Sequence, residues 1–329
     1  MSDIEVSRRS LLTGASTLAA ASFVGNLMGP AQAKTAMLNT QAPYWYRFKH
    51  GAFEMTVVSD GPLPLGEPSA SFLGTTKETV QKALADNFLP TDHVVLEQNA
   101  LVVNTSDHLV LFDNGMGTAK VFGPTTGKLL ASLKAADLDP KHVTAICFTH
   151  AHIDHCWGTM ADDGSRNFPN AQLYIAQNEL EFWTDEGKLS GTGWVKDFVA
   201  GARKHLLPNR DRIVFFKDGQ EILPGITALS APGHTVGHTC YMITSEGKSI
   251  CNIGDLTHHQ VLLVETPRLE FAYDTDSKQS ARTRVRTLDM LATDRIPLIA
   301  YHFPWPGIGH VGKYGDGFRY FPTPMKMVL

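Results

Sequence analysis

Short apolar runs along this chain are rich in β-branched and aromatic residues, and Gly, Pro, Asp and Asn bound them. Runs of this kind are typical of β-strands. They predict strands at residues 53–59, 94–103, 108–112, 143–148, 172–175, 213–216, 226–230, 241–244, 249–253 and 298–301. Apolar residues at helical spacing predict helices instead. These fall at 77–87, 126–136, 178–183, 195–206 and 279–291.

The predicted strands share a feature at their C-terminal ends, where four of them are followed closely by His or Asp. The residues are His150, His234, Asp255 and His302. Side chains delivered from several strand ends to one edge of a sheet can converge on a single site. We therefore expect these four residues to lie close together.

The densest polar cluster is Thr149-His150-Ala151-His152-Ile153-Asp154-His155, directly after the apolar run 143–148. Imidazole nitrogens and carboxylate oxygens are good ligands for Zn²⁺ and similar cations. A His-rich surface loop is the alternative interpretation. H-x-H-x-D-H spacing favours a metal site.

The composition indicates a folded protein without an electrostatic preference for polyanions. Hydrophobic residues make up 43% of the 329 residues and charged residues 19%, which suits a sizeable core. The net charge of −4 gives no case for binding nucleic acid or an anionic membrane. None of the four cysteines forms a C-x-x-C pair. Cys240 and Cys251 flank a predicted hairpin turn, where a disulfide is open but two small buried thiols are favoured.

Residues 1–33 have the pattern of a twin-arginine (Tat) signal peptide. Arg8 and Arg9 precede a mild apolar stretch, and Ala31-Gln32-Ala33 offers a cleavage site before Lys34. We expect recognition by the Tat export machinery, a periplasmic or secreted location and no stable membrane insertion after cleavage. The mature domain would then be residues 34–329.

Several motifs together resemble the metallo-β-lactamase superfamily. They are T-H-A-H-I-D-H (149–155), A-P-G-H-T-V-G-H-T (231–239), G-D (254–255), Y-H-F (301–303) and the earlier L-F-D-N-G (111–115). The resemblance implies an α/β fold, the αβ/βα four-layer sandwich. Two mixed β-sheets would pack face to face, flanked by helices, with the site at one sheet edge.

The resemblance also implies a centre of two divalent metal ions, with Zn favoured and Mn, Co or Fe also suitable. His150, His152 and His234 would hold the first ion, and Asp154, His155 and His302 the second. Asp255 would bridge both ions, next to a bridging hydroxide that attacks the substrate. Asp255 and His302 are thus the expected catalytic residues. His238 and Asp113 would support the ligands by hydrogen bonding.

Further segments are similar to the methyl parathion hydrolase group and its lactonase and arylesterase relatives. They include F-G-P-T-T-G (122–127), F-P-N-A (168–171) and H-F-P-W-P-G-I-G-H (302–310). This implies a small-molecule lactone, aryl ester or phosphotriester as substrate, and leaves a homodimer open. The expected pocket residues are Leu65, Phe122, Trp183, Phe198, His258 and Tyr273. The polar His258 and Tyr273 favour lactones and aryl esters over phosphotriesters.

Three other functions are weighed at this point: a β-lactamase, a diiron oxidoreductase of the same fold and a non-catalytic periplasmic metal-binding protein. The bridging position of Asp255 argues against the first. The second would normally carry a carboxylate where His152 stands. The complete ligand set argues against the third. The sequence does not assign roles to His259 and His310, and it leaves pocket lining as one of several roles for His258.

Overall fold

The computed structural model describes residues 37–42 and 44–329, so the predicted signal peptide and its cleavage site lie outside the described residues. The chain divides into two units, Met1–Ala42 and Pro43–Leu329. The described residues of the first unit, 37–42, are exposed and have no regular secondary structure. All helices and strands of the described residues lie in the second unit.

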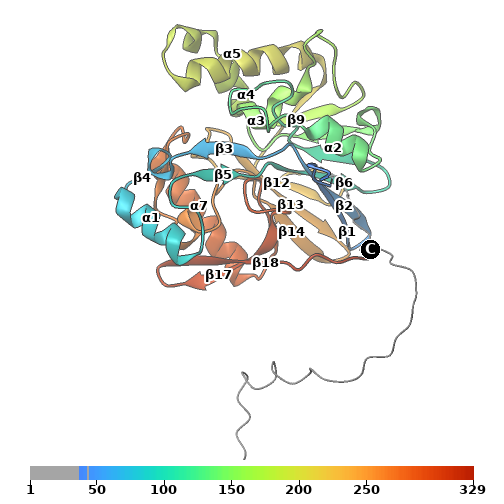
Figure 1. The fold of residues 1–329 in the computed structure, drawn as a ribbon. Coiled ribbons are helices and arrows are strands. Elements are labelled where there is room, and N and C mark those ends of the chain that lie inside the picture. The colour runs from blue at the N-terminus through green and yellow to red at the C-terminus, as the bar shows by residue number, and fades with distance from the viewer. Residues whose placement is uncertain (1–36, 43) are drawn as a thin grey trace, which may run out of the picture. The chain divides into compact units, whose positions relative to one another are not determined.

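Two seven-stranded sheets form the centre of this unit (Figure 1). The first sheet has the order β1-β2-β6-β7-β8-β9-β10 and the second β11-β12-β13-β14-β16-β17-β18. Both are mixed: β7, β8, β9 and β10 pair in parallel, as do β14 and β16, whereas the remaining pairs are antiparallel. Two small antiparallel pairs, β3 with β5 and β4 with β15, complete the strands.

The strands of the first sheet are β1 (Trp45–His50), β2 (Phe53–Ser59), β6 (Asn99–Asn104), β7 (Leu109–Phe112), β8 (Ala145–Cys147), β9 (Gln172–Ala176) and β10 (Ile213–Phe216). Those of the second are β11 (Glu221–Leu223), β12 (Ile226–Ser230), β13 (Thr239–Ser245), β14 (Lys248–Asn252), β16 (Leu298–Ile299), β17 (Ile308–Tyr314) and β18 (Gly317–Pro322). The short pairs are β3 (Leu63–Gly66), β5 (Val94–Leu96), β4 (Phe72–Leu73) and β15 (Glu270–Phe271).

The helices are α1 (Lys77–Asp86), α2 (Leu129–Ala135), α3 (Ile153–Cys156), α4 (Gln177–Thr184), α5 (Trp194–Leu206), α6 (Leu262–Glu265) and α7 (Ser277–Thr293). In Figure 1, α2 to α5 lie on one side of the sheets and α7 lies on the other. In the described residues no helix is long and apolar enough to span a membrane.

Three hydrophobic clusters correspond to the three interfaces between four layers. One joins the first sheet to α2 and α5, the second lies between the two sheets, and the third joins the second sheet to α6 and α7. Alternation along β2 shows the principle, because Met55 and Val57 enter the cluster between the sheets while Val58 faces the helices. Strands that are buried on both faces have continuous runs of apolar residues in their sequence. The predicted αβ/βα four-layer sandwich of the α/β class is confirmed.

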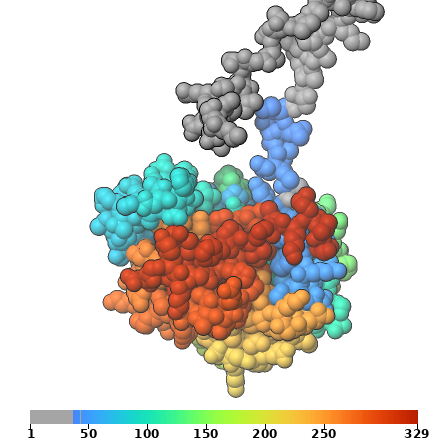
Figure 2. Space-filling model, turned by 90° about the horizontal axis from the view of Figure 1, so that it is seen from below, coloured from blue at the N-terminus to red at the C-terminus, as the bar shows by residue number. Residues whose placement is uncertain are grey.

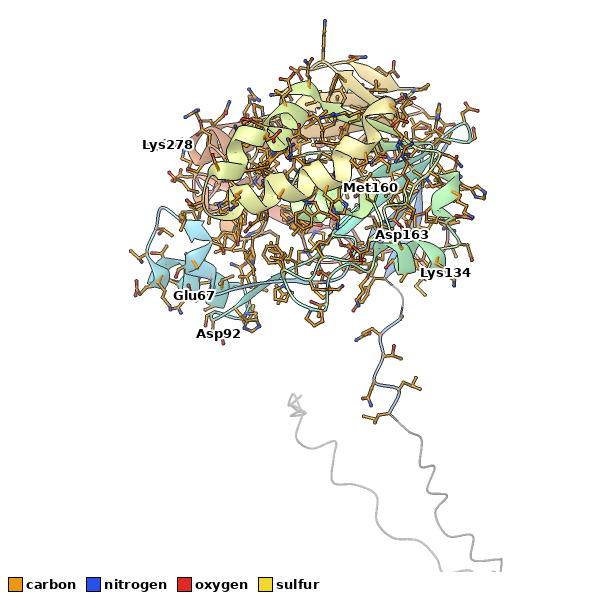
Figure 3. All side chains as sticks on the ribbon, turned by 90° about the horizontal axis from the view of Figure 1, so that it is seen from above. Glu67, Asp92, Lys134, Met160, Asp163 and Lys278 are labelled. Atoms are coloured by element: carbon orange, nitrogen blue, oxygen red, sulfur yellow. The ribbon has the colours of Figure 1, made fainter. Side chains whose placement is uncertain are left out.

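The strand predicted over 94–103 is wrong in one respect, since it is interrupted at Glu97 and Gln98. The Gln98 side chain donates to the Gly61 carbonyl (2.6 Å), and the Gln98 carbonyl accepts from the Asp60 N–H (2.9 Å). These bonds turn the chain, so that β5 leaves the first sheet and pairs with β3. Figure 3 shows Glu67 and Asp92, both in the segment between β2 and β6, on the same side of the domain.

In the described part of the chain, seven strands are present where no strand is predicted: β1, β3, β4, β11, β15, β17 and β18. β1 and β18 are edge strands with partly exposed residues, so their apolar alternation is weak. The C-terminal segment lies beside β1, because the Lys326 N–H donates to the Tyr46 hydroxyl (2.9 Å). Figure 2 shows the red C-terminal residues next to the blue N-terminal strands.

The helix predicted over 126–136 begins only at Leu129. Gly127 has a positive φ of 71°, which a helix does not accommodate. The first N–H groups of α2 are bound by a distant residue, since Asp60 accepts from Leu129 through its Oδ1 (2.7 Å) and from Lys128 through its carbonyl (2.9 Å). Cys240 and Cys251 are free and buried, which confirms the favoured interpretation as buried thiols.

Candidate metal centre

Five histidines and two aspartates predicted as ligands come together at one end of the sandwich. His150 follows β8 of the first sheet, while His234, Asp255 and His302 follow β12, β14 and β16 of the second. The expected convergence of strand ends therefore occurs, although the strands belong to two sheets rather than one. The seven residues are all buried.

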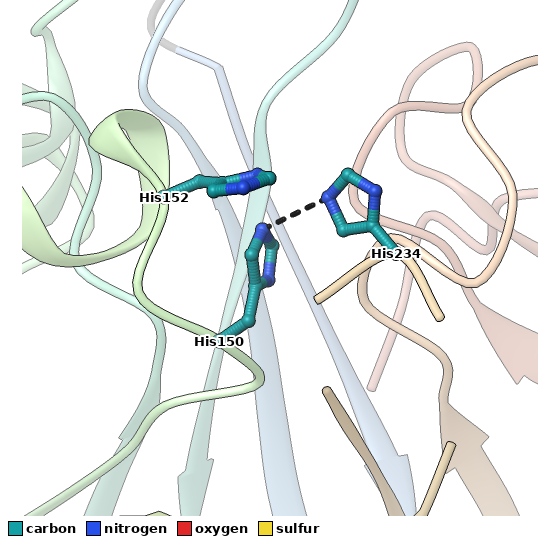
Figure 4. Close-up of side chains that lie close together, drawn as sticks. All are labelled: His150, His152 and His234. Atoms are coloured by element: carbon teal, nitrogen blue, oxygen red, sulfur yellow. Dashed lines mark hydrogen bonds between the residues drawn. The ribbon is translucent and has the colours of Figure 1, made fainter. Parts of the chain in front are cut away.

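His150, His152 and His234 form the first group, with ligand atoms within 4.8 Å of one another. Figure 4 shows the three imidazoles pointing toward a common centre. The Nε2 atoms of His150 and His234 are 3.2 Å apart. His152 precedes the first residue of α3, so the start of this short helix directs its side chain into the group.

Asp154, His155 and His302 form the second group. Asp154 and His155 lie in the single turn of α3. Asp154 Oδ2 lies 3.5 Å from His155 Nε2 and 3.4 Å from His302 Nε2. The α3 turn and the residue before it thus place ligands of both groups within four consecutive positions, 152–155.

Asp255 lies between the two groups. Its Oδ2 atom is 3.2 Å from His155 Nε2, 3.1 Å from His302 Nε2, 3.4 Å from His234 Nε2 and 3.7 Å from His150 Nε2. One carboxylate oxygen is therefore within reach of imidazoles from both groups, which is the geometry a bridging ligand needs.

Three of the five imidazoles have Nδ1 engaged by a partner outside the centre, which leaves their Nε2 atoms to face it. Asp113 Oδ2 accepts from His155 Nδ1 (2.9 Å), and the Glu97 carbonyl accepts from His302 Nδ1 (2.7 Å). His234 Nδ1 lies 2.8 Å from Asp274 Oδ1. Bonds of this type fix the tautomer and the ring orientation of a ligand histidine.

His238 and Asp113 occupy supporting positions. His238 Nδ1 donates to the Ala231 carbonyl (3.1 Å), and its Nε2 accepts from the Asp255 N–H (3.0 Å). With both nitrogens engaged, His238 has no atom left for a metal. Asp113 also accepts from the Thr149 N–H and hydroxyl (both 2.8 Å), which ties His155 to the start of the His cluster.

Burial and mutual charge set the protonation of the centre. Burial, with the neighbouring imidazoles, lowers the pKa of His150 and of His152 far below the ordinary value. Burial by itself would raise the pKa of Asp255, but the charges of His155 and His302 hold it well below its usual range. Neutral imidazole and ionised carboxylate are the forms that bind metal. Burial alone would lower the pKa of His155, His234 and His302, but the carboxylates that face them outweigh it and raise the pKa, to about 9 for His234. These three imidazoles would therefore release a proton when a metal binds.

The donor set fits divalent cations because several buried nitrogen and oxygen atoms of the seven residues have no hydrogen-bond partner. Within the described residues, His152 Nε2, His155 Nε2 and Asp255 Oδ1 are buried without a hydrogen bond. Buried polar atoms without partners are costly. Imidazole nitrogen and carboxylate oxygen are the usual ligands of Zn²⁺ and related ions.

The comparison with protein families decides the family. The family described as "Metallo-beta-lactamase superfamily" matches residues 93–300, more than half of the chain. The chain belongs to the metallo-β-lactamase superfamily. The narrower expectation of a methyl parathion hydrolase group stays a prediction.

Similar members of the superfamily include lactonases and a hydrolase. The chain is 26% identical over 162 residues to the N-acyl homoserine lactonases AttM of Rhizobium johnstonii and Agrobacterium fabrum. The match covers 47% of this chain and 56% of each relative, so it spans little more than half of their length.

Two solved structures resemble the chain over most of its length. The hydrolase AbOPH, of the beta lactamase superfamily, is 28% identical with a TM-score of 0.80, covering 87% of this chain and 100% of its own. AidC, a dizinc quorum-quenching lactonase, is 26% identical with a TM-score of 0.76, covering 86% and 98%. These likenesses support a hydrolase of the superfamily.

A cavity with about 340 Å³ of unfilled space, part of it open to solvent, adjoins the candidate centre of this superfamily member. Five of the six expected pocket residues line it: Leu65, Phe122, Phe198, His258 and Tyr273. Trp183 does not. It is completely buried and packs edge-on against His152, with ring centroids 4.8 Å apart, so it supports the ligand from behind.

Several residues that contact the centre or the cavity are absent from the sequence-based set. Asp274 holds His234, and its carboxylate faces the buried Arg284 (3.7 Å). Leu63, Leu96 and Phe271 line the cavity. Asp274 could have been considered, because it lies in the polar segment Tyr273-Asp274-Thr275-Asp276, but nothing local distinguishes it from a turn residue.

The three histidines without an assigned role, His258, His259 and His310, lie in three different environments. His258 Nε2 is 3.1 Å from Asp255 Oδ2, and its ring stacks on Phe271 with centroids 3.9 Å apart. His259 accepts from the N–H groups of Val261 and Leu262 and so supports the start of α6. His310 is exposed on β17.

Proposed function

We propose that this protein is a metal-dependent hydrolase that cleaves lactones or aryl esters, with phosphotriesters as the less favoured class. The observation that carries the proposal is the pair of ligand groups with Asp255 between them, beside an apolar cavity. The lactonases AttM and AidC among its relatives support the lactone class.

The residues that would hold two divalent ions are His150, His152 and His234 for one, and Asp154, His155 and His302 for the other. Asp255 would contact both. When bound, such ions supply Lewis-acid polarisation and a water whose pKa is lowered toward about 7. Zinc suits this nitrogen-rich set, and Mn²⁺, Co²⁺ and Fe²⁺ also accept it.

The cavity wall would bind an apolar substrate group and exclude water. Phe198 and Tyr273 lie nearly parallel, with an interplanar angle of 7° and centroids 6.5 Å apart, and Phe122 meets Tyr273 edge-on. Aromatic walls of this kind favour flat or aliphatic groups packed against them. An aryl leaving group or the acyl chain of a lactone would occupy this space.

His258 is the polar group best placed to act between Asp255 and the cavity. Its Nε2–H donates toward Asp255 Oδ2 (3.1 Å), which orients the carboxylate. Its Nδ1 is buried without a partner in the described residues, and the residue lines the cavity. Nδ1 can therefore accept a hydrogen bond from a substrate or a water molecule.

The test is a substrate panel on protein whose metal content has been quantified. We expect hydrolysis of N-hexanoyl homoserine lactone and 4-nitrophenyl esters, weaker hydrolysis of a phosphotriester, and loss of activity with a chelator. Asp255→Ala should reduce kcat/KM by at least about 100-fold, since it removes the shared ligand.

Two outcomes would contradict this proposal. Efficient nitrocefin cleavage with no lactone or ester turnover would indicate a β-lactamase. Stoichiometric metal binding without hydrolysis of any substrate in the panel would indicate a metal-binding protein.

We also propose that residues 1–33 direct Tat export and are removed before Lys34. The support is the sequence pattern alone. Arg8→Lys with Arg9→Lys should retain the protein in the cytoplasm, because the paired arginines are the recognition feature. N-terminal sequencing of exported protein that still begins with Met1 would contradict cleavage.

A further inference from the structure

Glu179 in α4 is a buried carboxylate that contacts two loops of the candidate metal centre at once. Its side chain is completely buried. Oε1 accepts from the Ala151 N–H (2.9 Å), and Oε2 accepts from the Gly237 N–H (2.7 Å). Ala151 lies between His150 and His152, and Gly237 lies three residues after His234. One side chain therefore joins the loops that carry the first ligand group.

The residue before Glu179 strengthens the contact with the second loop. Asn178 Nδ2 donates to the Val236 carbonyl (2.8 Å), which belongs to the same peptide group as the Gly237 N–H. Both polar ends of this peptide are thus held by consecutive residues of α4. A Cβ at Gly237 would lie 2.6 Å from Asn178 Oδ1 and 2.7 Å from Glu179 Cβ, so only glycine permits this approach.

Burying a carboxylate in this position costs folding free energy, which indicates that Glu179 has a specific role. Ionised groups lose hydration on burial, and two backbone donors recover only part of the loss. Burial raises the pKa of Glu179, while the bonds from Ala151 and Gly237 oppose the rise. An apolar residue would fill the space at lower cost but would leave both N–H groups unpaired.

We propose that Glu179 is a positioning residue that fixes the His150–His152 loop relative to the His234 loop, so that the three imidazoles hold one metal ion. The ligand loops come from different sheets, and neither sheet alone sets their separation. His150 Nε2 and His234 Nε2 are 3.2 Å apart. The two hydrogen bonds of Glu179 would maintain this distance. The proposal rests on the metal-binding part of the proposed function and not on hydrolysis.

The experiment is a Co²⁺ titration of metal-free protein, followed by its visible absorption, with Zn²⁺ affinity measured by competition against a chelator. The variants are Glu179→Gln and Glu179→Ala. In Glu179→Gln an amide NH₂ faces one of the two N–H donors, which breaks one bond at nearly unchanged volume. Glu181→Gln is the matched control, since Glu181 is exposed on the same helix and accepts a hydrogen bond from Gln177 Nε2 (2.8 Å), away from the ligand loops.

We expect Glu179→Gln to raise the Kd of one of the two metal ions by about 10- to 100-fold. This is the range for residues that orient ligands. The second ion, held by Asp154, His155 and His302, should be affected less. Glu179→Ala should raise the Kd of the same ion further. Glu181→Gln should bind both ions with the affinities of the wild type. If Glu179→Ala does not fold, Glu179→Gln alone decides.

A purely structural role makes a different prediction. In that case Glu179→Gln lowers the urea midpoint of metal-free protein but leaves both metal affinities of the folded protein unchanged, which would overturn the proposal. Equal weakening of both ions would overturn it as well. If wild type and variants differ in metal affinity while none hydrolyses any substrate, the hydrolase proposal fails and the assignment of Glu179 stands.

Discussion

At the scale of single residues, three imidazoles of the candidate centre are held by hydrogen bonds on the side that faces away from it. Asp113, Asp274 and the Glu97 carbonyl each bind a Nδ1 atom. These partners leave Nε2 free and directed inward. A histidine outside the centre, His205, shows what burial does when such a partner is missing.

His205 makes the folded protein sensitive to acid. Its ring stacks on Trp157 at 5.6 Å, its Nδ1 is buried without a partner in the described residues, and burial lowers its pKa to about 4. The unfolded chain, with a pKa of about 6.5, takes up the proton first as the pH falls. The stability is thus complete above about pH 6.5 and is lost as the pH falls toward 4.

We predict that His205→Phe, which keeps the stacked ring, removes this contribution. When the pH falls from 7.5 to 5.5, the unfolding free energy of the wild type should fall by about 1.3 kcal/mol more than that of the variant. Urea denaturation at the two pH values measures the difference, and His142→Phe on the surface serves as the control. Parallel pH dependence of wild type and His205→Phe would contradict the prediction.

The ligand set could be read from the sequence because its spacing is local or follows strand ends. His150 to His155 occupy one short segment, and His234, Asp255 and His302 each follow a predicted strand. Asp274 and Glu179 could not be found in this way. They act on backbone or ring atoms of segments distant in the chain, so only the tertiary fold makes them neighbours of the centre.

At the scale of elements, α5 shows a close approach that sequence periodicity does not reveal. A Cβ built on Gly201 would overlap the indole ring of Trp157, which lies directly after α3. The helix therefore packs against the segment after the His cluster through a position without a side chain. Such a glycine is retained for packing rather than for helix stability.

We predict that Gly201→Ala lowers the unfolding free energy by about 1–3 kcal/mol, the usual cost of overpacking. The loss occurs although alanine favours a helix over glycine by about 1 kcal/mol. Trp157→Phe combined with Gly201→Ala should recover part of it, because the overlapping indole atoms are removed. A Gly201→Ala variant as stable as the wild type in urea would contradict this packing.

Predicted and observed elements agree where burial produces a clear apolar pattern. The inner strands β2, β7, β9 and β12 lie within or close to their predicted ranges. The interruption at Glu97 could not be predicted, because residues 94–103 are apolar enough for one strand and the turn depends on Gly61 and His302. Edge strands β1 and β18 lack the alternation on which prediction depends.

At the scale of the whole molecule, the ligand groups connect the two sheets. His150 follows the first sheet, whereas His234, Asp255 and His302 follow the second. Metal bound by all of them would therefore tie the two halves of the sandwich together. The unfolded chain does not offer this arrangement, so binding favours the folded state.

We predict that zinc raises the melting temperature by several degrees over protein treated with a chelator. A free metal concentration of 100 times the Kd adds about 2.7 kcal/mol to the unfolding free energy. Differential scanning calorimetry measures the shift, and Mg²⁺ is the control because it prefers oxygen ligands in octahedral geometry. Equal melting temperatures with zinc and with chelator would contradict the prediction.

The interruption between β5 and β6 places a cavity residue of this protein directly beside a residue that holds a candidate metal ligand. Leu96 forms part of the cavity wall, and the next residue, Glu97, holds His302 through its carbonyl. A library randomised at this wall would alter substrate preference and metal retention together. Leu65 and Phe122, which belong to other segments of the wall, would be freer to vary. Adaptation to a new substrate would then begin at those positions, with Leu96 changing only after the metal site had been stabilised elsewhere.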